Sequence, residues 1–374
     1  MLYIHIPFCR QACHYCNFHF STTLNVIQDY VDCLIAEIKL QQHYLSKKTL
    51  RSIYFGGGTP SLLSFQQIMS IFDALNTYYN FDKSIEITLE ANPDDLSLPY
   101  LLELQKTPVN RLSIGVQSFF DKHTTPLHRS HTQIQTHYAI TTAQDIGLQN
   151  ITIDLMYGLN NLNLNEWQEN LYQIQQYQLK HFSAYCLTIE PKTALYKHIN
   201  QKKVIMPKDE QVLDQFNYLL QFAQSNNFLH YEISNFAQTN YMAKHNTNYW
   251  KSHHYLGLGA SAHSYNGVSR QWNINNNIQY IQKIKQEKIP FTKEILTKKN
   301  QYNEFVMTRL RTIFGVKLCE LDKEFGKQYH NHFIVHIAKH LKNGNVLICD
   351  NIYTFSNNGK FISDSILSDL FLLD

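Results

Sequence analysis

Three of the seven cysteines, Cys9, Cys13 and Cys16, lie close together near the start of the chain. Their spacing is C-x3-C-x2-C in the string CRQACHYC, which places three thiols on one short loop. Three thiolates can bind three irons of a [4Fe–4S] cube and leave the fourth iron open to a substrate. A zinc site completed by His14 or His19 is the alternative, although zinc favours four ligands and C-x2-C pairs. The spacing therefore favours an iron–sulfur cluster.

The elements that must position this loop are predicted from the hydrophobic pattern. Up to about residue 225, β-branched or aromatic runs alternate with stretches of helical periodicity, the latter at roughly 26–44, 65–78, 98–105, 133–146, 166–176 and 209–224. This alternation predicts an α/β fold with a parallel sheet, either open or a partial (βα)6 TIM-like barrel, because a closed barrel needs eight units. The expected strands are Leu2–Ile6, Ser52–Phe55, Ile85–Glu90, Arg111–Gln117, Ile151–Met156 and Phe182–Leu187.

Residues able to do chemistry cluster at the carboxyl ends of these strands, where barrels of this kind place their active sites. The cysteines follow the first strand, a glycine-rich loop at Gly56–Thr59 follows the second, and Glu90 ends the third. Gln117 ends the fourth strand, and Asp154 lies within the fifth. The glycine-rich loop lacks the GK[ST] of a phosphate-binding P-loop. The pattern thus predicts one functional site at this end of the sheet.

Three segments are expected along the chain. Residues 1–228 form the partial barrel, and residues 229–289 form a linker segment that is dense in aromatic residues and histidine. Residues 290–374 form a smaller, α-rich C-terminal domain, with helices expected at 303–311, 329–341 and 364–372 and a short hairpin over 346–355.

The composition narrows the class of protein. The 374 residues are 44% hydrophobic, which is enough for a sizeable core, and the net charge of +3 is too small to indicate a nucleic-acid partner. An odd number of cysteines without an export signal argues against a secreted disulfide scaffold. No run of 18 apolar residues predicts a transmembrane helix. A cytoplasmic protein in a reducing compartment is therefore expected.

The cysteine motif, with Tyr15 just before its last cysteine, resembles that of radical S-adenosylmethionine (SAM) enzymes. The rest of the chain resembles a narrower family, the oxygen-independent coproporphyrinogen oxidase group with its HemN-like and HemW-like branches. The segments that carry this resemblance occur in the same order as in that family: FGGGTPS at 55–61, LEANPDDL, NRLSIGVQSF, LHRSH and IDLMYGL. The resemblance implies a radical SAM barrel with a [4Fe–4S] cluster and SAM, whose cleavage gives a 5′-deoxyadenosyl radical. It also implies which residues line the SAM pocket: Tyr3, Tyr15, Gly57, Gly58, Thr59, Glu90, Gln117, Arg129, Asp154 and, less securely, Thr188.

Three features distinguish the two branches. The decarboxylating oxidases carry a further cysteine two residues after the third ligand, where this chain has Phe18. They also carry a long extension before the first strand, whereas here Tyr3 is almost the first residue. Finally, HNTNYW at 245–250 resembles the haem-handling motif of HemW-type haem chaperones. The features together favour the chaperone branch.

The motif suits haem chemically. Haem iron accepts an axial imidazole, here from His245, and Asn246 is expected to orient that ring. Tyr249 and Trp250 would supply flat apolar surface for the macrocycle. Nearby rival ligands remain open: His253, His254 and His263.

The expected function is that of a haem chaperone that carries a [4Fe–4S] cluster and SAM and delivers haem to haem-requiring, respiratory acceptor proteins. The resemblance also implies a homodimer and leaves a peripheral membrane contact open. The alternative is an enzyme of porphyrin and haem biosynthesis that converts coproporphyrinogen III propionates to vinyls by radical decarboxylation. The sequence leaves open whether the chain is an enzyme.

Overall fold

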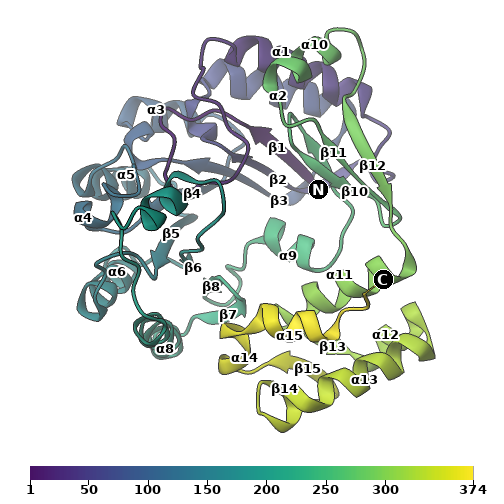
Figure 1. Cartoon of the computed structure of the whole chain (residues 1–374). Coiled ribbons are helices and arrows are strands. Elements are labelled where there is room, and N and C mark those ends of the chain that lie inside the picture. Colours follow the sequence, from purple (N-terminus) through teal and green to yellow (C-terminus); the bar gives the residue numbers. More distant parts are fainter. Residues whose placement is uncertain (374) are drawn as a thin grey trace.

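Six parallel strands lie side by side in the order of the chain in the computed structural model, which describes residues 1–373 (Figure 1). The neighbouring pairs are parallel throughout, as expected. All six predicted strands are present: β1 (Leu2–Ile6), β2 (Thr49–Gly57), β3 (Asn80–Ala91), β4 (Arg111–Gln117), β5 (Ile151–Tyr157) and β6 (His181–Cys186).

Helices cover the outer face of this sheet and bury one side of every strand (Figure 1). Every second residue of a strand points to this outer face, and such residues, for example Ile53 and Phe55, are fully buried against the helices. Three of the helices begin with a capping box, at Ser64, Thr132 and Asn163, which fixes where each one starts. The helices are α1 (Ile27–Leu40), α2 (Phe65–Tyr78), α3 (Leu98–Leu104), α4 (Asp121–Thr124), α5 (Gln133–Asp145), α6 (Leu164–Gln176) and α8 (Asp209–Ser225).

The remaining residues of each strand point to the inner face of the sheet, which is polar. Tyr54 and Glu90 share a hydrogen bond there, and Arg111 lies between Thr88 and His181. Because strand residues alternate between faces, each strand contributes both to the apolar core and to this inner surface. The arrangement leaves ionisable groups gathered inside the curved sheet.

The sheet extends past both ends of the six-stranded set. β9 (Leu256–Leu258) pairs in parallel with β1, and β8 (Asn235–Ala237) and β7 (Leu229–Glu232) continue antiparallel beyond β6. Among the described residues, the two outermost strands, β7 and β9, do not pair with each other, so the sheet is an open arc. Helix α9 (Lys244–Trp250) lies on the open side of this arc (Figure 1).

The segment 229–289, expected as a linker that carries the haem motif, contains further strands and helices. Besides β7, β8 and β9, it contains β10 (His263–Tyr265), β11 (Ser269–Asn273) and α10 (Asn277–Ile284). β10 and β11 form a second sheet with β12 (Phe291–Ile295). Tyr280 and Ile284 of α10 belong to the same hydrophobic core as the barrel.

A buried carboxylate fastens this segment to α1. Glu37 is fully buried and accepts hydrogen bonds from the backbone N–H of Gly259 (2.7 Å), the hydroxyl of Tyr280 (2.7 Å) and the amides of Gln41 (2.8 Å) and Asn273 (2.6 Å). Four donors satisfy the carboxylate, which makes its burial tolerable.

The C-terminal part has a hydrophobic core of its own, separate from that of the barrel. Its contacts with the preceding segments include the ion pair of Arg270 on β11 with Glu304 (2.9 Å) and the packing of the Phe216 ring of α8 against that of Phe361 (5.5 Å). Its elements are α11 (Lys298–Leu310), β13 (Val316–Lys317), α12 (Leu318–Phe325), α13 (Lys327–Lys342), β14 (Val346–Cys349), β15 (Ile352–Phe355), α14 (Asn357–Phe361) and α15 (Ser363–Leu370).

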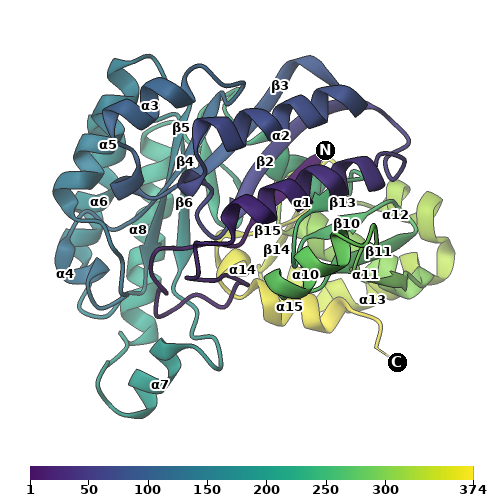
Figure 2. The ribbon, with the colours of Figure 1, turned by 90° about the horizontal axis from the view of Figure 1, so that it is seen from above.

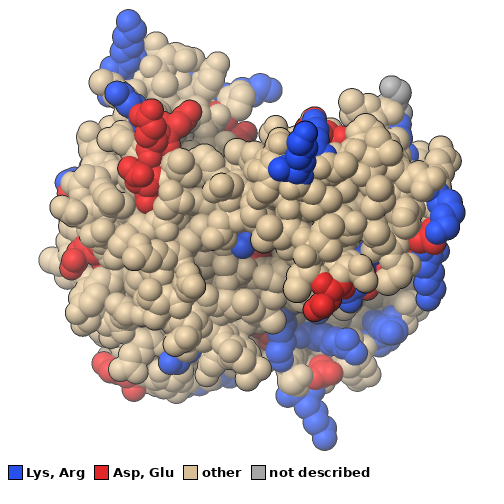
Figure 3. All heavy atoms as spheres, turned by 90° about the horizontal axis from the view of Figure 1, so that it is seen from below, with Lys and Arg blue, Asp and Glu red and all other residues tan. Residues whose placement is uncertain are grey.

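Two surface properties bear on partners. Across residues 1–373, no helix is both long and apolar enough to cross a bilayer. The face shown in Figure 3 is mostly uncharged, and its Lys and Arg side chains lie in separate groups toward the rim, interspersed with Asp and Glu. That face therefore presents no continuous basic surface.

Candidate functional site

The cysteine loop leaves the carboxyl end of β1 and is tied down from three sides. Cys9 N–H donates to the Ser21 carbonyl (3.0 Å), and His14 N–H donates to the Leu127 carbonyl (3.0 Å). The His14 carbonyl accepts from Leu195 N–H (2.8 Å), which attaches the loop to α7 (Ala194–Asn200), and Figure 2 shows the two segments side by side. The loop is therefore held in place by the protein itself.

The three thiols of this loop are free and partly buried. The Thr59 hydroxyl lies 3.5 Å from Cys9 Sγ, and Arg129 Nη1 lies 3.6 Å from Cys13 Sγ. Burial raises the pKa of Cys9 to about 11, although the Thr59 hydrogen bond and the Arg129 charge oppose that rise. Ligation by iron requires the thiolate, so assembly of a cluster on this loop must release protons.

The donor set suits a cluster better than a zinc ion. Each candidate fourth ligand for zinc uses one ring nitrogen within the protein: His14 Nδ1 bonds the Pro126 carbonyl (3.0 Å), and His19 Nε2 bonds Asn277 Oδ1 (2.8 Å). Throughout the described chain, no three His, Cys, Asp or Glu side chains converge on one point as ligands of a single ion. A cube needs no such convergence, because each thiolate binds its own iron.

The glycine-rich loop after β2 packs directly against the start of the cysteine loop. Gly58 N–H donates to the Ile6 carbonyl (3.0 Å), and Thr59 N–H donates to the Phe8 carbonyl (2.7 Å). Gly57 has φ of +107°, and a Cβ atom on it would lie 2.4 Å from the His5 ring. Only glycine fits there, so the approach of the two loops explains this part of the motif.

Glu90 connects the glycine-rich loop to the inner face of the sheet. Its carboxylate accepts from Gly57 N–H (3.1 Å) and from the Tyr54 hydroxyl (2.7 Å). Burial raises the pKa of Glu90 to about 7, and the nearby Asp154 carboxylate adds to the rise. Burial likewise raises the pKa of Asp154, whose Oδ2 lies 3.5 Å from the Ser113 hydroxyl. These carboxyls are suited to hold an ammonium group or hydroxyls.

Arg129 connects the cysteine loop to the carboxyl ends of β3 and β4. Its Nη2 donates to Asn92 Oδ1 (2.7 Å) and to the Gly115 carbonyl (2.7 Å), and its Nη1 faces Cys13. Its Nε is buried without a partner among the described residues, which leaves one donor for a bound group. Tyr15 lies next to Arg129 and packs on the core. Asn92, which also bonds Thr59 (3.3 Å), was not singled out from the sequence.

The remaining predicted SAM residues lie at different depths. Tyr3 is deeper in the sheet, where its hydroxyl bonds His5 Nδ1 (2.9 Å). Gln117 ends β4 in a left-handed conformation (φ +65°) and is buried. Thr188 lies past the end of β6, is exposed, and its hydroxyl lies 3.5 Å from the Cys186 carbonyl. The structure thus gathers most of the set around the cysteine loop, with Thr188 at the margin.

The histidine of HNTNYW lies toward the other end of the sheet. His245 is 1% exposed, and its Nδ1 is 2.9 Å from the Ser52 hydroxyl on β2. Its Nε2 has no partner in the part of the chain that the structure describes. Burial lowers the pKa of His245 to about 3, so the ring is neutral at physiological pH. The Glu86 carboxylate accepts from the N–H groups of Lys244 and His245 (2.8 Å each) and fixes the start of α9.

The rest of the motif continues around α9. The Tyr249 ring packs edge-on against His245 (4.9 Å) and Tyr255 (4.6 Å). Tyr249 and Trp250 line a small pocket of about 130 Å³. Asn246 is partly buried, and the hydrogen bond expected from it to the His245 ring is made by Ser52 instead.

Comparisons with known proteins agree with this geometry. Residues 3–171 match the model of the radical SAM superfamily. The Bacillus subtilis protein named heme chaperone HemW is 31% identical to this chain over 368 residues, which are 97% of each chain. The Escherichia coli protein of the same name is 34% identical over 264 residues, and this match covers 70% of this chain and 69% of the relative. The solved structure of HemN, an Escherichia coli coproporphyrinogen III oxidase described as a radical SAM enzyme, superposes with a TM-score of 0.84 at 22% identity, over 99% of this chain and 89% of that one.

Proposed function

The chain belongs to the family of proteins named heme chaperone HemW, within the radical SAM superfamily, and from this membership we propose that it binds haem and passes it to haem-requiring proteins. The observation that carries the proposal is the match over 97% of both chains to a protein named a heme chaperone. The likeness to the oxidase HemN, at 22% identity, concerns the fold alone.

The superfamily implies a [4Fe–4S] cluster and SAM, and the residues at the carboxyl end of the sheet fit both. We propose that Cys9, Cys13 and Cys16 ligate the cluster. Bound to its open iron, SAM is a source of the deoxyadenosyl radical. The chain's own groups would bind and orient the cofactor, with Glu90 accepting hydrogen bonds and the free Arg129 Nε donating one. The other SAM-binding residues of the proposal are Tyr3, Tyr15, Gly57, Gly58, Thr59, Gln117, Asp154 and Thr188.

Haem is the cargo of this proposal, and the region of His245, Asn246, Tyr249 and Trp250 is where we place it. Direct ligation by His245 would require its enclosed ring to become accessible, because Ser52, Tyr54 and Tyr249 surround it. The identity of the acceptor and the formation of a homodimer stay predictions.

Two measurements on anaerobically reconstituted protein test the proposal. Haemin titration followed by the Soret band should show saturable, stoichiometric binding. In parallel, coproporphyrinogen III is supplied with SAM and a reductant, and the proposal expects no protoporphyrinogen. If the protein converts coproporphyrinogen III and shows no saturable haemin binding, the proposal of a haem chaperone is wrong and the protein is an oxidase. Phe18, 70% exposed where the oxidases have a further cysteine, favours the first result.

A further inference from the structure

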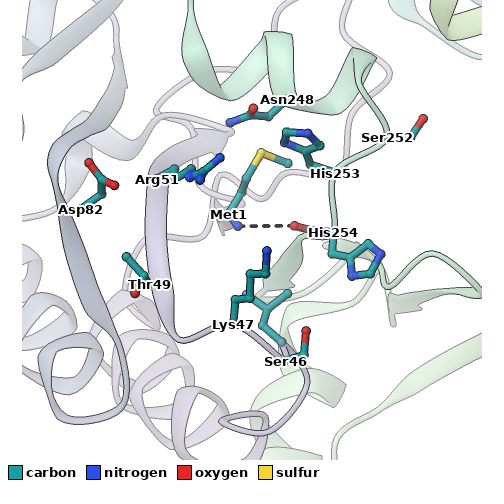
Figure 4. Close-up of a pocket in the computed structure, with 11 residues that line it drawn as sticks. Met1, Ser46, Lys47, Thr49, Arg51, Asp82, Asn248, Ser252, His253 and His254 are labelled. Carbon is teal, nitrogen blue, oxygen red and sulfur yellow. Dashed lines mark hydrogen bonds between the residues drawn. The ribbon is translucent and has the colours of Figure 1, made fainter.

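A pocket of about 450 Å³ opens at the amino-terminal end of the sheet, at the opposite end of the strands from the cysteine loop (Figure 4). It lies between the start of β1 and β2 on one side and the turn that follows α9 on the other. Its volume is in the range of small-molecule sites. Among its lining residues Met1 and Leu45 are the apolar ones, and none is Phe, Tyr or Trp, so the pocket suits a polar ligand.

Lys47 and Arg51 supply positive charge to this pocket. Both are exposed, and neither forms an ion pair within residues 1–373. In Figure 4 the charged ends of the two side chains point toward the same space beside Met1. A ligand that brings negative charge would therefore meet two cations that no carboxylate of the protein already holds.

The surroundings of the pocket add to its positive charge. A neighbouring hollow of about 440 Å³ shares Arg51 and Asp82 with the pocket and is also lined by Lys244 and Lys251. Asp82, the carboxylate in both linings, already accepts hydrogen bonds at Oδ1 from the N–H and the hydroxyl of Ser84 (2.8 Å each). Four cations thus stand against one carboxylate around the two hollows. A concave surface lined mainly by one sign of charge concentrates ions of the opposite sign.

The imidazole of His253, which also lines the pocket, feels these charges. Partial burial lowers the pKa of His253, and the charges of Lys251 and Arg51 lower it further. The ring is therefore neutral at pH 7, where it can offer a hydrogen bond to a ligand. An anion bound in the pocket would relieve the repulsion among the cations.

We propose that this pocket binds the phosphate group of a polar small molecule, with Lys47 and Arg51 as its cationic contacts. A phosphate monoester carries about −1.5 to −2 charges at pH 7 and three strong acceptor oxygens, so it accepts donors that arrive from different directions. The donors here belong to three separate parts of the chain, because Lys47 precedes β2, Arg51 lies on β2 and Asn248 lies on α9. The rest of the cavity leaves room for the body of the ligand. This inference goes beyond the proposed function, because it requires neither haem nor the cluster.

The test titrates pyrophosphate into the full-length protein and follows binding by calorimetry. Lys47→Gln with Arg51→Gln should weaken binding at least roughly tenfold, because two charge-assisted contacts are lost. Lys202→Gln with Lys203→Gln removes the same charge from exposed lysines that follow α7, and it should leave the affinity unchanged. If the parent shows no saturable binding, or if the Lys47/Arg51 variant, folded by circular dichroism, binds pyrophosphate as the parent does, the assignment is wrong.

Two further probes define the ligand. Citrate, whose negative charge lies on planar carboxylates, should bind the parent at least roughly tenfold more weakly than pyrophosphate, and equal binding would overturn the assignment to phosphate. Vesicles of phosphatidylcholine and phosphatidic acid present the same group on a lipid. If the parent binds these vesicles through Lys47 and Arg51 but does not bind pyrophosphate, the phosphate is that of a lipid headgroup and the small-molecule assignment is wrong. None of these measurements uses haemin, so their failure leaves the proposed function to its own test.

Discussion

Replacing Gly57 by Ala tests whether the glycine-rich loop is shaped by its contact with β1. The residue has φ of +107°, where a side chain costs about 1–2 kcal/mol. The new Cβ would also lie 2.4 Å from the buried His5 ring, and forcing extra atoms into a packed site costs about 1–3 kcal/mol. The expected loss in free energy of unfolding is therefore roughly 2–5 kcal/mol.

The chain provides a matched control for the backbone part of this loss. Gly147 has φ of +94°, and a Cβ there would have its nearest neighbour at 4.0 Å. Gly147→Ala should thus cost only the conformational part, about 1–2 kcal/mol. In the double variant His5→Ala/Gly57→Ala the ring is gone, so the steric part, roughly 1–3 kcal/mol, should be recovered relative to the sum of the single changes.

Urea unfolding of cluster-free protein, followed by circular dichroism, gives the stabilities, and calorimetry of the reconstituted protein gives SAM affinity. Gly57→Ala should weaken SAM binding at least roughly tenfold, because displacement of the loop moves Gly57 N–H away from Glu90. Gly147→Ala should leave that affinity unchanged. Equal stabilities and equal SAM affinities for Gly57→Ala and Gly147→Ala would refute the steric argument.

Three further predictions follow from the same contacts. Cys13→Ala should abolish the visible absorbance of the reconstituted cluster, whereas Cys33→Ala, at a buried thiol on α1, should retain it; a cluster that survives Cys13→Ala contradicts the ligand set. Glu37→Leu leaves four donors unsatisfied and should lower the free energy of unfolding by roughly 4 kcal/mol, measured in urea; a loss under about 1 kcal/mol would show that water replaces the carboxylate. Because burial raises the pKa of Glu90 from 4.5 to about 7, the stability this group contributes below pH 4.5 is lost as pH rises to 7, by about 3 kcal/mol at 1.36 kcal/mol per unit. Glu90→Gln should remove that slope from the pH dependence of unfolding, and an unchanged slope would assign it to other groups.

Much of the barrel could be predicted from the sequence because its signals are local. Each central strand is a run of β-branched and aromatic residues, and each helix carries an apolar stripe, so six strands and their helices lie close to their predicted positions. The cysteine loop could be predicted for the same reason, because its three cysteines lie within eight consecutive residues of the sequence. The glycine-rich loop was found too, but the reason for Gly57 is a contact with His5 on another strand.

The region between residues 229 and 295 shows where local patterns fail. β8, β9 and β10 have three residues each, too few for a period of two to be distinguished from chance. Their pairing is set by distant partners, such as β9 beside β1, and by Glu37, which looks like an ordinary surface charge on a helix. The acid is buried only because Gly259, Asn273 and Tyr280 return to it from more than 220 residues along the chain. No window of sequence contains that information.

The same limit applies to the site, where β2 connects two regions that the sequence presents separately. Near its amino-terminal end Ser52 bonds His245, while at its carboxyl end Gly57 contacts the start of the cysteine loop and Glu90. Between them Tyr54 contacts both, with its ring 5.1 Å from His245 and its hydroxyl on Glu90. Because alternate residues of one strand share a face, Ser52 and Tyr54 both face the inner side of the sheet, where Tyr54 contacts the proposed cargo region and the proposed cofactor region. The haem motif and the cluster motif, more than 220 residues apart in sequence, are thereby joined by direct contacts inside one sheet.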